Sequence, residues 1–483
     1  MEISNLQPRA LWENFSAICK IPHPSGLSEP IRNFLVDFGK SLSLETLTDE
    51  VGNVLIRKPA TPGMENAPIV VLQAHMDMVP QKNSHVNHNF ETDPIQAYVD
   101  GEWVKAKDTT LGADNGIGMA AIMAVLQSKE IKHGPIEALI TVDEETGMHG
   151  AFGLKEGFVK GKILMNTDSE DWGELFVGCA GGVDVTASIQ YKEETEMPEG
   201  DIALKISVTG LKGGHSGCDI HLGRANANKL LFRFLKPAVA EYEARLSWVK
   251  GGSLRNAIPR EAFAIVTIPA EAKEEFMEMA DEFAADIRED YRGVETSIQF
   301  TVEETEMPKT LIPEEIQDNI INAIVAVQNG AARFLTDMPD VVETSSNMAI
   351  ISAENGTFSA KFLVRGSNDN LKMDLASSIE STFALAGAKV EFSGAYPGWN
   401  PNMDSKILQV MKDAYKKMYG VEPKVNVIHA GLECGIIGAA CPGMDMISYG
   451  PTVRFPHSPD EKVNIADVAH FWDYTVAVLE NMK

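Results

Sequence analysis

Histidine and carboxylate side chains that could bind metal ions follow several of the short apolar runs in this chain. His75 and Asp77 end the predicted strand that contains Leu72. Side chains alternate along a strand, so both point to the same side, roughly 6 to 7 Å apart at the backbone. An imidazole can bind a metal through one ring nitrogen while a neighbouring carboxylate orients it through the other. Taken alone the pair is a weak signal, because such pairs are common on protein surfaces.

Acidic or imidazole groups occur at four further places in the sequence. These places are Gly112-Ala113-Asp114-Asn115-Gly116, Asp143-Glu144-Glu145, Asn166-Thr167-Asp168 and Pro456-His457-Ser458-Pro459-Asp460. Three consecutive acids repel one another and usually lie in an exposed turn, although a cation would also relieve the repulsion. The glycine-rich segment lacks the Lys and Ser/Thr of a phosphate-binding loop, so phosphate is not its expected ligand. Because open α/β sheets bind ligands at their strand ends, the whole set favours a metal site.

The two ends of the chain alternate short apolar strands with helices. Predicted strands are 54–56, 69–72, 136–142 and 163–165 in the first part, and 425–428 and 444–448 in the last. Predicted helices are 31–42, which Ser28 could cap, 115–127, 404–418 and 465–482. Such alternation is typical of an α/β domain. We therefore predict a catalytic α/β domain whose mixed sheet is covered by helices.

The middle of the chain has a different order that occurs twice. The first copy is predicted as strand 204–208, helix 225–246, strands near 254 and at 262–268, helix 271–286 and strand 297–302. The second is predicted as helix 313–327, strands 347–351 and 357–364, helix 371–383 and strand 389–392. Both fit most of a ferredoxin-like βαββαβ unit. The predicted domains are the catalytic domain, 1–181 and 397–483, and an inserted α+β lid or dimerisation domain, 182–396.

The balance of charge excludes some classes of partner. The 483 residues contain 42 Lys and Arg against 69 Asp and Glu, which gives a formal net charge of −27. Phosphate backbones are bound by clustered basic residues, so nucleic acid is not an expected partner. The first residues lack the pattern of a signal peptide, and no segment reaches the roughly 18 apolar residues of a membrane span. We therefore expect a cytoplasmic protein without a membrane partner.

The ordered motifs resemble those of the dinuclear-zinc peptidases, the family that includes aminoacylase and glutamate carboxypeptidase. The match consists of His75-x-Asp77, Gly112–Gly116, Glu144–Gly147, Asn166–Asp168 and His457–Asp460. Further segments are similar to the branch of this family that hydrolyses aminoacyl-histidine dipeptides, namely Gln73–Lys82, Lys212–Gly217, Arg255–Glu261 and His429–Gly435. The resemblance covers nearly the whole chain, including the inserted domain.

The resemblance implies two divalent metal ions per subunit. By this resemblance His75 and Asp168 hold one ion, Glu145 and His457 hold the other, and the Asp114 carboxylate bridges both. Zinc is the expected ion, although nitrogen and oxygen ligands without thiolates also accept cobalt or manganese. By the same resemblance Glu144 is the catalytic base, and Asp77 orients His75.

The resemblance also implies substrate contacts outside the metal ligands. His215, in a Gly-Gly-His-Ser-Gly loop, would stabilise the oxyanion together with a metal. Asn256 and Arg365 are carried over as substrate-binding residues, and the Arg365 guanidinium could bind a substrate's C-terminal carboxylate. Glu433 is predicted, from its charge and glycine-rich setting alone, to meet the free amino group of a dipeptide. An ordinary loop histidine and an exposed strand arginine are the alternatives for His215 and Arg365.

The implied function is hydrolysis of small dipeptides, including those that end in histidine, by a metal-activated water. Two alternatives stay open: the same site could act on N-acyl amino acids or longer exopeptidase substrates, or the chain could bind peptides without hydrolysing them. Binding alone is disfavoured because it would not require Glu144. The sequence is compatible with either a homodimer or a monomer. Relatives with a single lid unit pair through it between chains, whereas a duplicated lid unit could make the same pairing within one chain.

Overall fold

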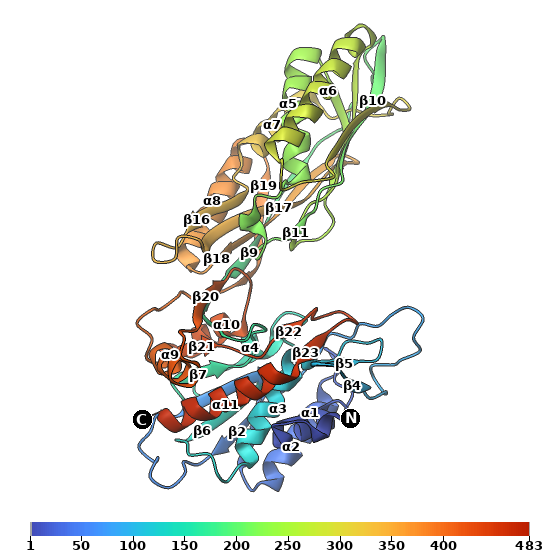
Figure 1. The fold of residues 1–483 in the computed structure, drawn as a ribbon. Helices are drawn as coiled ribbons and strands as arrows, with labels where there is room; N and C mark the ends of the chain where they lie inside the picture. The colour runs from blue at the N-terminus through green and yellow to red at the C-terminus, as the bar shows by residue number, and fades with distance from the viewer. Residues whose placement is uncertain (1, 483) are drawn as a thin grey trace. The chain divides into compact units, whose positions relative to one another are not determined.

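A computed structural model describes residues 2–482, and the chain forms two compact units. Unit 1 contains the chain up to Cys179, Trp399–Val427 and the chain from Leu432. Unit 2 contains Ala180–Gly398 and Ile428–Gly431. Figure 1 labels the helices of both units and many of their strands. Each unit has its own large sheet, so the two are described one after the other.

Unit 1 is built on a sheet of eight strands (Figure 1). In spatial order they are β1 (Glu45–Thr48), β2 (Val54–Lys58), β6 (Ile136–Thr141), β3 (Val70–His75), β7 (Ile163–Asn166), β21 (Asp445–Ser448), β8 (Glu174–Cys179) and β20 (Lys424–Ile428). β3 is parallel to β6 and β7, and β7 is parallel to β21, so the carboxyl ends of these strands meet at one edge. β2 is antiparallel to β6. Every residue of β3 and β6 is buried, which confirms a covered mixed sheet.

Helices cover the sheet of unit 1. They are α1 (Arg9–Ile18), α2 (Glu29–Ser41), α3 (Ala113–Gln127), α4 (His149–Gly153), α9 (Lys406–Tyr419), α10 (Glu433–Ala440) and α11 (Ile465–Asn481). α3 contacts β3 and β6, whereas α9 and α10 contact β21. One helix start differs from the prediction: Ser28 makes no capping hydrogen bond to α2. Its hydroxyl donates instead to Asp143 Oδ1 at 3.0 Å, so the serine connects α2 to the acidic turn.

A smaller sheet of four strands completes unit 1. Its spatial order is β22 (Val453–Arg454), β23 (Lys462–Asn464), β5 (Trp103–Ala106) and β4 (Ala97–Asp100). β23 and β5 are antiparallel, with Lys462 opposite Lys105. This pairing brings the chain that follows His457 beside the chain that leads to Asp114.

Unit 2 is built on a sheet of nine strands with helices on one face (Figure 1). In spatial order the strands are β15 (Gln299–Glu304), β10 (Asp201–Thr209), β14 (Ala262–Pro269), β12 (Arg245–Gly251), β17 (Val342–Glu354), β18 (Thr357–Gly366), β9 (Gly181–Gln190) and β19 (Lys389–Tyr396), and β16 (Gly330–Phe334) pairs with β17. The helices are α5 (Ala227–Tyr242), α6 (Lys273–Asp290), α7 (Glu314–Ala326) and α8 (Asp369–Leu385). The ferredoxin-like description of each half, and the role of this unit as a lid, stay predictions.

Three details of unit 2 differ from the predicted elements. The helix predicted over 225–246 ends at Tyr242, because Glu243 takes a left-handed φ of 51° and β12 begins at Arg245. The strand predicted near Leu254 lies earlier in the chain, as β12, and Leu254 itself is in an exposed loop after it. The strand beside β18 and β19 is β9, which precedes the whole first half in the sequence. The second half is therefore not a continuous segment.

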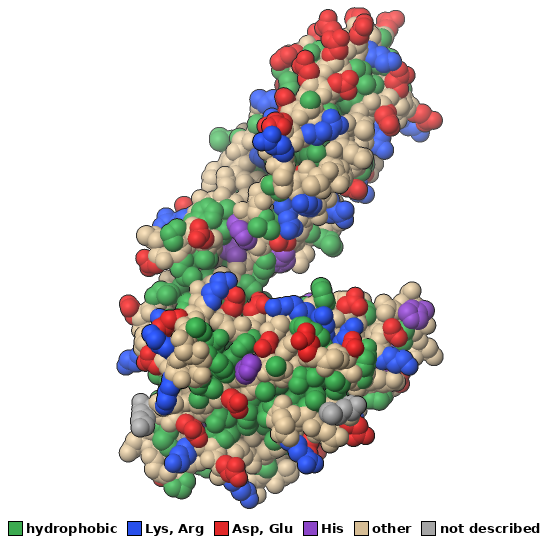
Figure 2. Space-filling view, in the orientation of Figure 1, with side chains coloured by type: hydrophobic (Ala, Val, Ile, Leu, Met, Phe, Trp, Pro, Cys, Tyr) green, Lys and Arg blue, Asp and Glu red, His purple; other side chains and the backbone are tan. Residues whose placement is uncertain are grey.

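The surface of the described residues is strongly acidic in places. Figure 2 shows acidic side chains gathered at the end of unit 2 that carries α6. The exposed acids of this helix include Glu274, Glu278, Asp281 and Glu282. Such a surface does not attract a phosphate backbone.

Within residues 2–482, no helix has the length and apolar character needed to cross a membrane.

The chain that leaves β21 passes close to the chain that leaves β7. Tyr449 N donates to Asn166 O at 3.1 Å. A Cβ atom added to Gly450 would lie 1.8 Å from the carbonyl oxygen of Ser169, so only glycine permits this approach. The two contacts hold the backbone on either side of Asp168.

Gly450→Ala should destabilise the protein by about 3 kcal/mol, because a backbone carbonyl must move to accommodate the methyl group. Gly420→Ala is the matched control. Gly420 follows α9 with a φ of 75° and no atom within 4 Å of an added Cβ, so its replacement should cost only about 1 kcal/mol. Urea unfolding measures both free energies, and equal values for the two variants would contradict the close approach.

Candidate functional site

The residues predicted to bind metal all lie in unit 1, mostly just beyond strand ends. In chain order they are His75 at the end of β3, Asp114 in the first turn of α3, Glu145 after β6, Asp168 after β7, and His457 between β22 and β23. Asp114 has a ψ of 109°, which departs from helical geometry. His457 has a left-handed φ of 58°, which is uncommon for a residue with a side chain. Parallel strands ending at one sheet edge thus bring together residues far apart in sequence.

Asp114 lies between two clusters of possible ligand atoms. Its Oδ1 is 3.0 Å from His75 Nε2, which is also 3.3 Å from Asp168 Oδ1. Its Oδ2 is 3.3 Å from His457 Nε2, which is also 3.0 Å from Glu145 Oε2. In each of these sets of three residues, the ligand atoms lie within 4.8 Å of one another. Such an arrangement could hold two cations that share one carboxylate.

The donor atoms fit a pair of divalent cations. Each set offers one imidazole nitrogen and carboxylate oxygens, a combination that zinc, cobalt and manganese accept. Among residues 2–482, Oε1 of Glu145 is buried without a hydrogen-bond partner. A buried carboxylate oxygen is costly to leave unpaired, so this atom favours a bound cation. Glu144 adds another carboxylate within 4.8 Å of ligand atoms on His75 and Glu145.

Burial and crowding of charge change the protonation of this cluster. Burial raises the pKa of Glu144 well above its usual range, and neighbouring carboxylates add to the rise. Burial likewise raises the pKa of Glu145. Hydrogen bonds with Asp114 and Glu145 raise the pKa of His457 to about 11. Protons thus offset part of the negative charge that divalent cations would otherwise neutralise.

Asp77 is buried and connects His75 to the acidic turn. Its Oδ1 accepts a hydrogen bond from the backbone N–H of Glu144 at 3.0 Å and lies 3.4 Å from His75 Nδ1. Its Oδ2 accepts hydrogen bonds from Ser25 Oγ at 2.8 Å and from the backbone N–H of Glu145 at 3.3 Å. Because Nδ1 of the ring faces Asp77, Nε2 is directed towards the other ligands.

Sequence reasoning assigned no role to two side chains that hold this cluster. Asn115 Nδ2 donates a hydrogen bond to Asp168 Oδ1, and Ser25 donates to Asp77. Asn115 belongs to the glycine-rich motif, which is the only signal in the sequence for its role. Ser25 lies 52 residues from Asp77, and no local pattern connects the two.

Glu433, the first residue of α10, is completely buried. Its Oε2 accepts hydrogen bonds from Gln73 Nε2 at 2.6 Å and from Thr141 Oγ1 at 2.7 Å. Its Oε1 has no hydrogen-bond partner within the described chain, residues 2–482. Burial raises the pKa of this carboxyl to about 8. The predicted contact with a substrate amine stays a prediction, and it requires that the amine reach a carboxylate enclosed in unit 1.

Unit 2 places Arg365 beside His215. Arg365, on β18, is only 4% exposed, so the exposed alternative for this residue is wrong. Its Nη1 donates to the Tyr396 hydroxyl at 3.0 Å, and both Nε and Nη2 donate to Ser216 Oγ at 3.3 Å. Its Nη2 is 3.4 Å from His215 Nε2. Asn256 is exposed, and its backbone carbonyl accepts from Ser216 N at 2.8 Å.

The backbone around His215 determines which ring nitrogen carries the proton. His215 Nδ1 accepts hydrogen bonds from the N–H groups of Gly217 at 3.2 Å and Cys218 at 3.0 Å. A neutral ring must then carry its proton on Nε2. Burial, followed by the positive charge of Arg365, lowers the pKa of His215 to about 4. Two donors, His215 Nε2–H and Arg365 Nη2, therefore lie side by side and suit an acceptor that contacts both.

Comparison with known proteins identifies the family. The model of peptidase family M20/M25/M40 matches residues 71–481. The chain belongs to the M20/M25/M40 peptidase family. The matched range includes every residue of the candidate site described in this subsection except Ser25.

Two similar proteins cover the length of this M20/M25/M40 peptidase. Cytosol non-specific dipeptidase of Escherichia coli strain K12 is 44% identical over 481 residues, which are 100% of this chain and 99% of the relative. The crystal structure of aminoacylhistidine dipeptidase from Vibrio alginolyticus is 50% identical, covers 100% of this chain and 98% of its own, and has a TM-score of 0.94. A tripeptidase from Staphylococcus aureus, at 16% identity with 98% of each chain covered and a TM-score of 0.57, shares the fold alone.

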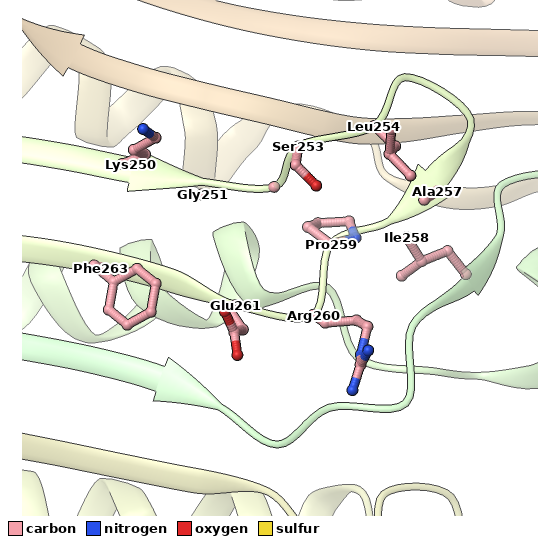
Figure 3. Close-up of a pocket in the computed structure, with 11 residues that line it drawn as sticks. Lys250, Gly251, Ser253, Leu254, Ala257, Ile258, Pro259, Arg260, Glu261 and Phe263 are labelled. Atoms are coloured by element: carbon pink, nitrogen blue, oxygen red, sulfur yellow. The ribbon is translucent and has the colours of Figure 1, made fainter. Parts of the chain in front are cut away.

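A pocket of about 470 Å³ lies in unit 2 of this M20/M25/M40 peptidase (Figure 3). It is formed by the loop between β12 and β14, and its charged side chains are Lys250, Arg260 and Glu261. None of the residues predicted to bind metal lines it, and neither His215 nor Arg365 does. We therefore assign it no part in the chemistry of the family.

His215 should stay neutral, with its proton on Nε2, down to about pH 5, because its pKa is lowered to about 4. Nitrogen NMR of histidine-labelled protein between pH 4 and 8 measures both the tautomer and the midpoint. Arg365→Met should raise the midpoint, because the variant removes a positive charge that opposes protonation. A wild-type midpoint near the ordinary value of about 6.5 would contradict this description of the site.

Proposed function

We propose that the protein is a metal-dependent dipeptidase that hydrolyses dipeptides with a free amino end, including aminoacyl-histidine dipeptides. The observation that carries the proposal is the placement of Asp114 between two sets of ligand atoms, with the Glu144 carboxylate close to His75 and Glu145. Membership of a peptidase family and similarity over the full length to two dipeptidases support the same activity.

The proposed cofactor is a pair of divalent ions, with zinc expected and cobalt or manganese as alternatives. His75 and Asp168 would hold one ion, Glu145 and His457 the other, and Asp114 both. When bound, such a pair lowers the pKa of a shared water and polarises the carbonyl group of the peptide. The ligands themselves contribute by keeping that pair in one place.

Glu144 is the proposed general base. Its carboxylate is close to Glu145 and His75, yet it belongs to neither of the two sets centred on Asp114. Burial gives it a raised affinity for protons, which suits a group that takes a proton from the attacking water and delivers it to the departing amine nitrogen. Asp77 keeps the His75 ring in position while this transfer occurs.

Unit 2 is proposed to supply the donors that recognise the substrate. The guanidinium of Arg365 suits the C-terminal carboxylate of a dipeptide, because its buried hydrogen bonds fix the orientation of the fork. His215 can donate from Nε2 to the negative charge that develops on the peptide oxygen. Asn256 is proposed as a further contact because it precedes β13 (Ala257–Ile258), which pairs with His215.

The proposed location is the cytosol, because the similar protein of Escherichia coli is named a cytosol dipeptidase. Small peptides are the expected partners, and the acidic surface argues against nucleic acid. A homodimer stays a prediction of the sequence, which light scattering of the purified protein tests directly.

Purified protein reconstituted with zinc should contain two metal ions per chain and hydrolyse aminoacyl-histidine and other dipeptides. N-acetyl amino acids and dipeptide amides should react at least about tenfold more slowly, because the first lack a free amine and the second lack the carboxylate. Elemental analysis and a substrate panel on one preparation measure both. Faster reaction of N-acetyl amino acids would favour an acylase, and peptide binding without hydrolysis would favour a carrier.

Glu144→Gln should lower kcat by about 10²- to 10⁴-fold while two metal ions stay bound, because the residue is proposed to act on a proton and is outside the two ligand sets centred on Asp114. Steady-state kinetics with elemental analysis checks this. Glu156→Gln, at an exposed position of the same unit, is the matched control and should behave as wild type. A retained kcat would remove Glu144 as the base, whereas lost metal would make it a ligand.

A further inference from the structure

Glu461 is a buried carboxylate that the proposed mechanism does not use. Glu461 is only 2% exposed. Its Oε2 accepts hydrogen bonds from the backbone N–H groups of Leu111 at 2.7 Å and Gly112 at 3.0 Å. Its Oε1 accepts from those of Ala113 at 2.8 Å and Asp114 at 3.3 Å. One carboxylate thus binds four consecutive N–H groups of the segment that ends in Asp114.

The small sheet of unit 1 places Glu461 at this segment. Glu461 directly precedes β23, and Lys462 of that strand pairs with Lys105 of β5. β5 ends at Ala106, and the chain continues from there to Asp114. His457 lies in the loop before β23, so one short stretch of chain carries both an implied ligand and the carboxylate that binds the backbone of another.

The first turn of α3 needs acceptors that its own sequence lacks. The first N–H groups of a helix have no partner within it, and Gly112 at the N-cap has no side chain to accept from them. Glu461 supplies the acceptors from far along the chain, 350 residues beyond Leu111. The cost is a further buried carboxylate beside Asp114, where like charges repel. Four hydrogen bonds from the backbone offset that cost.

We infer that Glu461 is a positioning residue that fixes Asp114 relative to His457 and thereby sets the affinity of the site for metal. Asp114 must direct one oxygen towards His75 and the other towards His457, which its own backbone geometry does not enforce. The four hydrogen bonds hold the backbone of Asp114, and the chain from Glu461 back to His457 holds the second ligand. The inference rests on the proposed function, because it assigns a role within the same metal site.

The test compares Glu461→Gln with a matched control, Glu137→Gln. Glu137 is also 2% exposed, accepts hydrogen bonds from the backbone N–H groups of Lys160 at 2.8 Å and Gly161 at 2.9 Å, and pairs with Arg57. Both replacements turn one acceptor oxygen into a donor that faces another donor: a backbone N–H group at position 461, and either backbone N–H groups or the Arg57 guanidinium at position 137. The measurements are zinc affinity by competition with a chromophoric chelator and urea unfolding of the metal-free proteins.

Both variants should lose stability, but only Glu461→Gln should lose zinc affinity, by about 10- to 100-fold. Equal zinc affinities for the two variants would overturn the inference. If Glu461→Gln does not fold, Glu461→Asp gives the same test, since its shorter side chain cannot reach all four N–H groups, and wild-type affinity in that variant would overturn the role. Wild-type protein that binds no zinc would instead contradict the proposed function.

Discussion

Repulsion between partly buried carboxylates is the constraint on which the rest of unit 1 depends. Asp114, Glu144, Glu145 and Asp168 converge with only two imidazoles among them, and burial strengthens their repulsion. The chain offsets it with backbone N–H groups, hydroxyls and amides, as at Asp77 and Asp168. Divalent cations supply the remaining positive charge in the proposed enzyme. The left-handed residues Asp143 and His457 fit this account, because backbone strain is tolerated where function requires a fixed geometry.

Much of this site could be predicted from the sequence because the sheet does most of the positioning. His75, Glu145 and Asp168 each follow an apolar strand, and parallel neighbours bring such residues to one edge whatever their separation along the chain. The imidazole and carboxylate groups of these residues then indicated metal binding. The assignment of each ligand to one of two ions needed the family resemblance, since spacing alone leaves the pairing open.

The features that the sequence could not predict depend on contacts with backbone atoms or on long-range pairing. Serine is a common helix-capping residue, but in the folded chain the Ser28 hydroxyl donates to Asp143 instead. Glu461 binds N–H groups, which every residue has, so no side-chain pattern marks its partners. β9 pairs with β18 and β19, which follow it by more than a hundred residues, and nothing local in its sequence indicates that register.

Unit 2 joins its two halves through one strand pair, and the proposed substrate donors depend on it. β12 of the first half pairs with β17 of the second, which makes the sheet continuous. His215 and Ser216 come from the first half and Arg365 from the second. The donor pair therefore exists only when both halves are folded together.

The separation of β9 from its neighbours also bears on how the chain is made on the ribosome. The strands from β10 to β15 are consecutive, so this half can fold soon after residue 304 has emerged. Both edges of β9 stay unpaired until β18 and β19 have been translated. The sheet of unit 1 likewise lacks β21 until nearly the whole polypeptide is available. Exposed strand edges can pair with other chains, so this order of synthesis leaves the edges of β9 open to aggregation until its partners are translated.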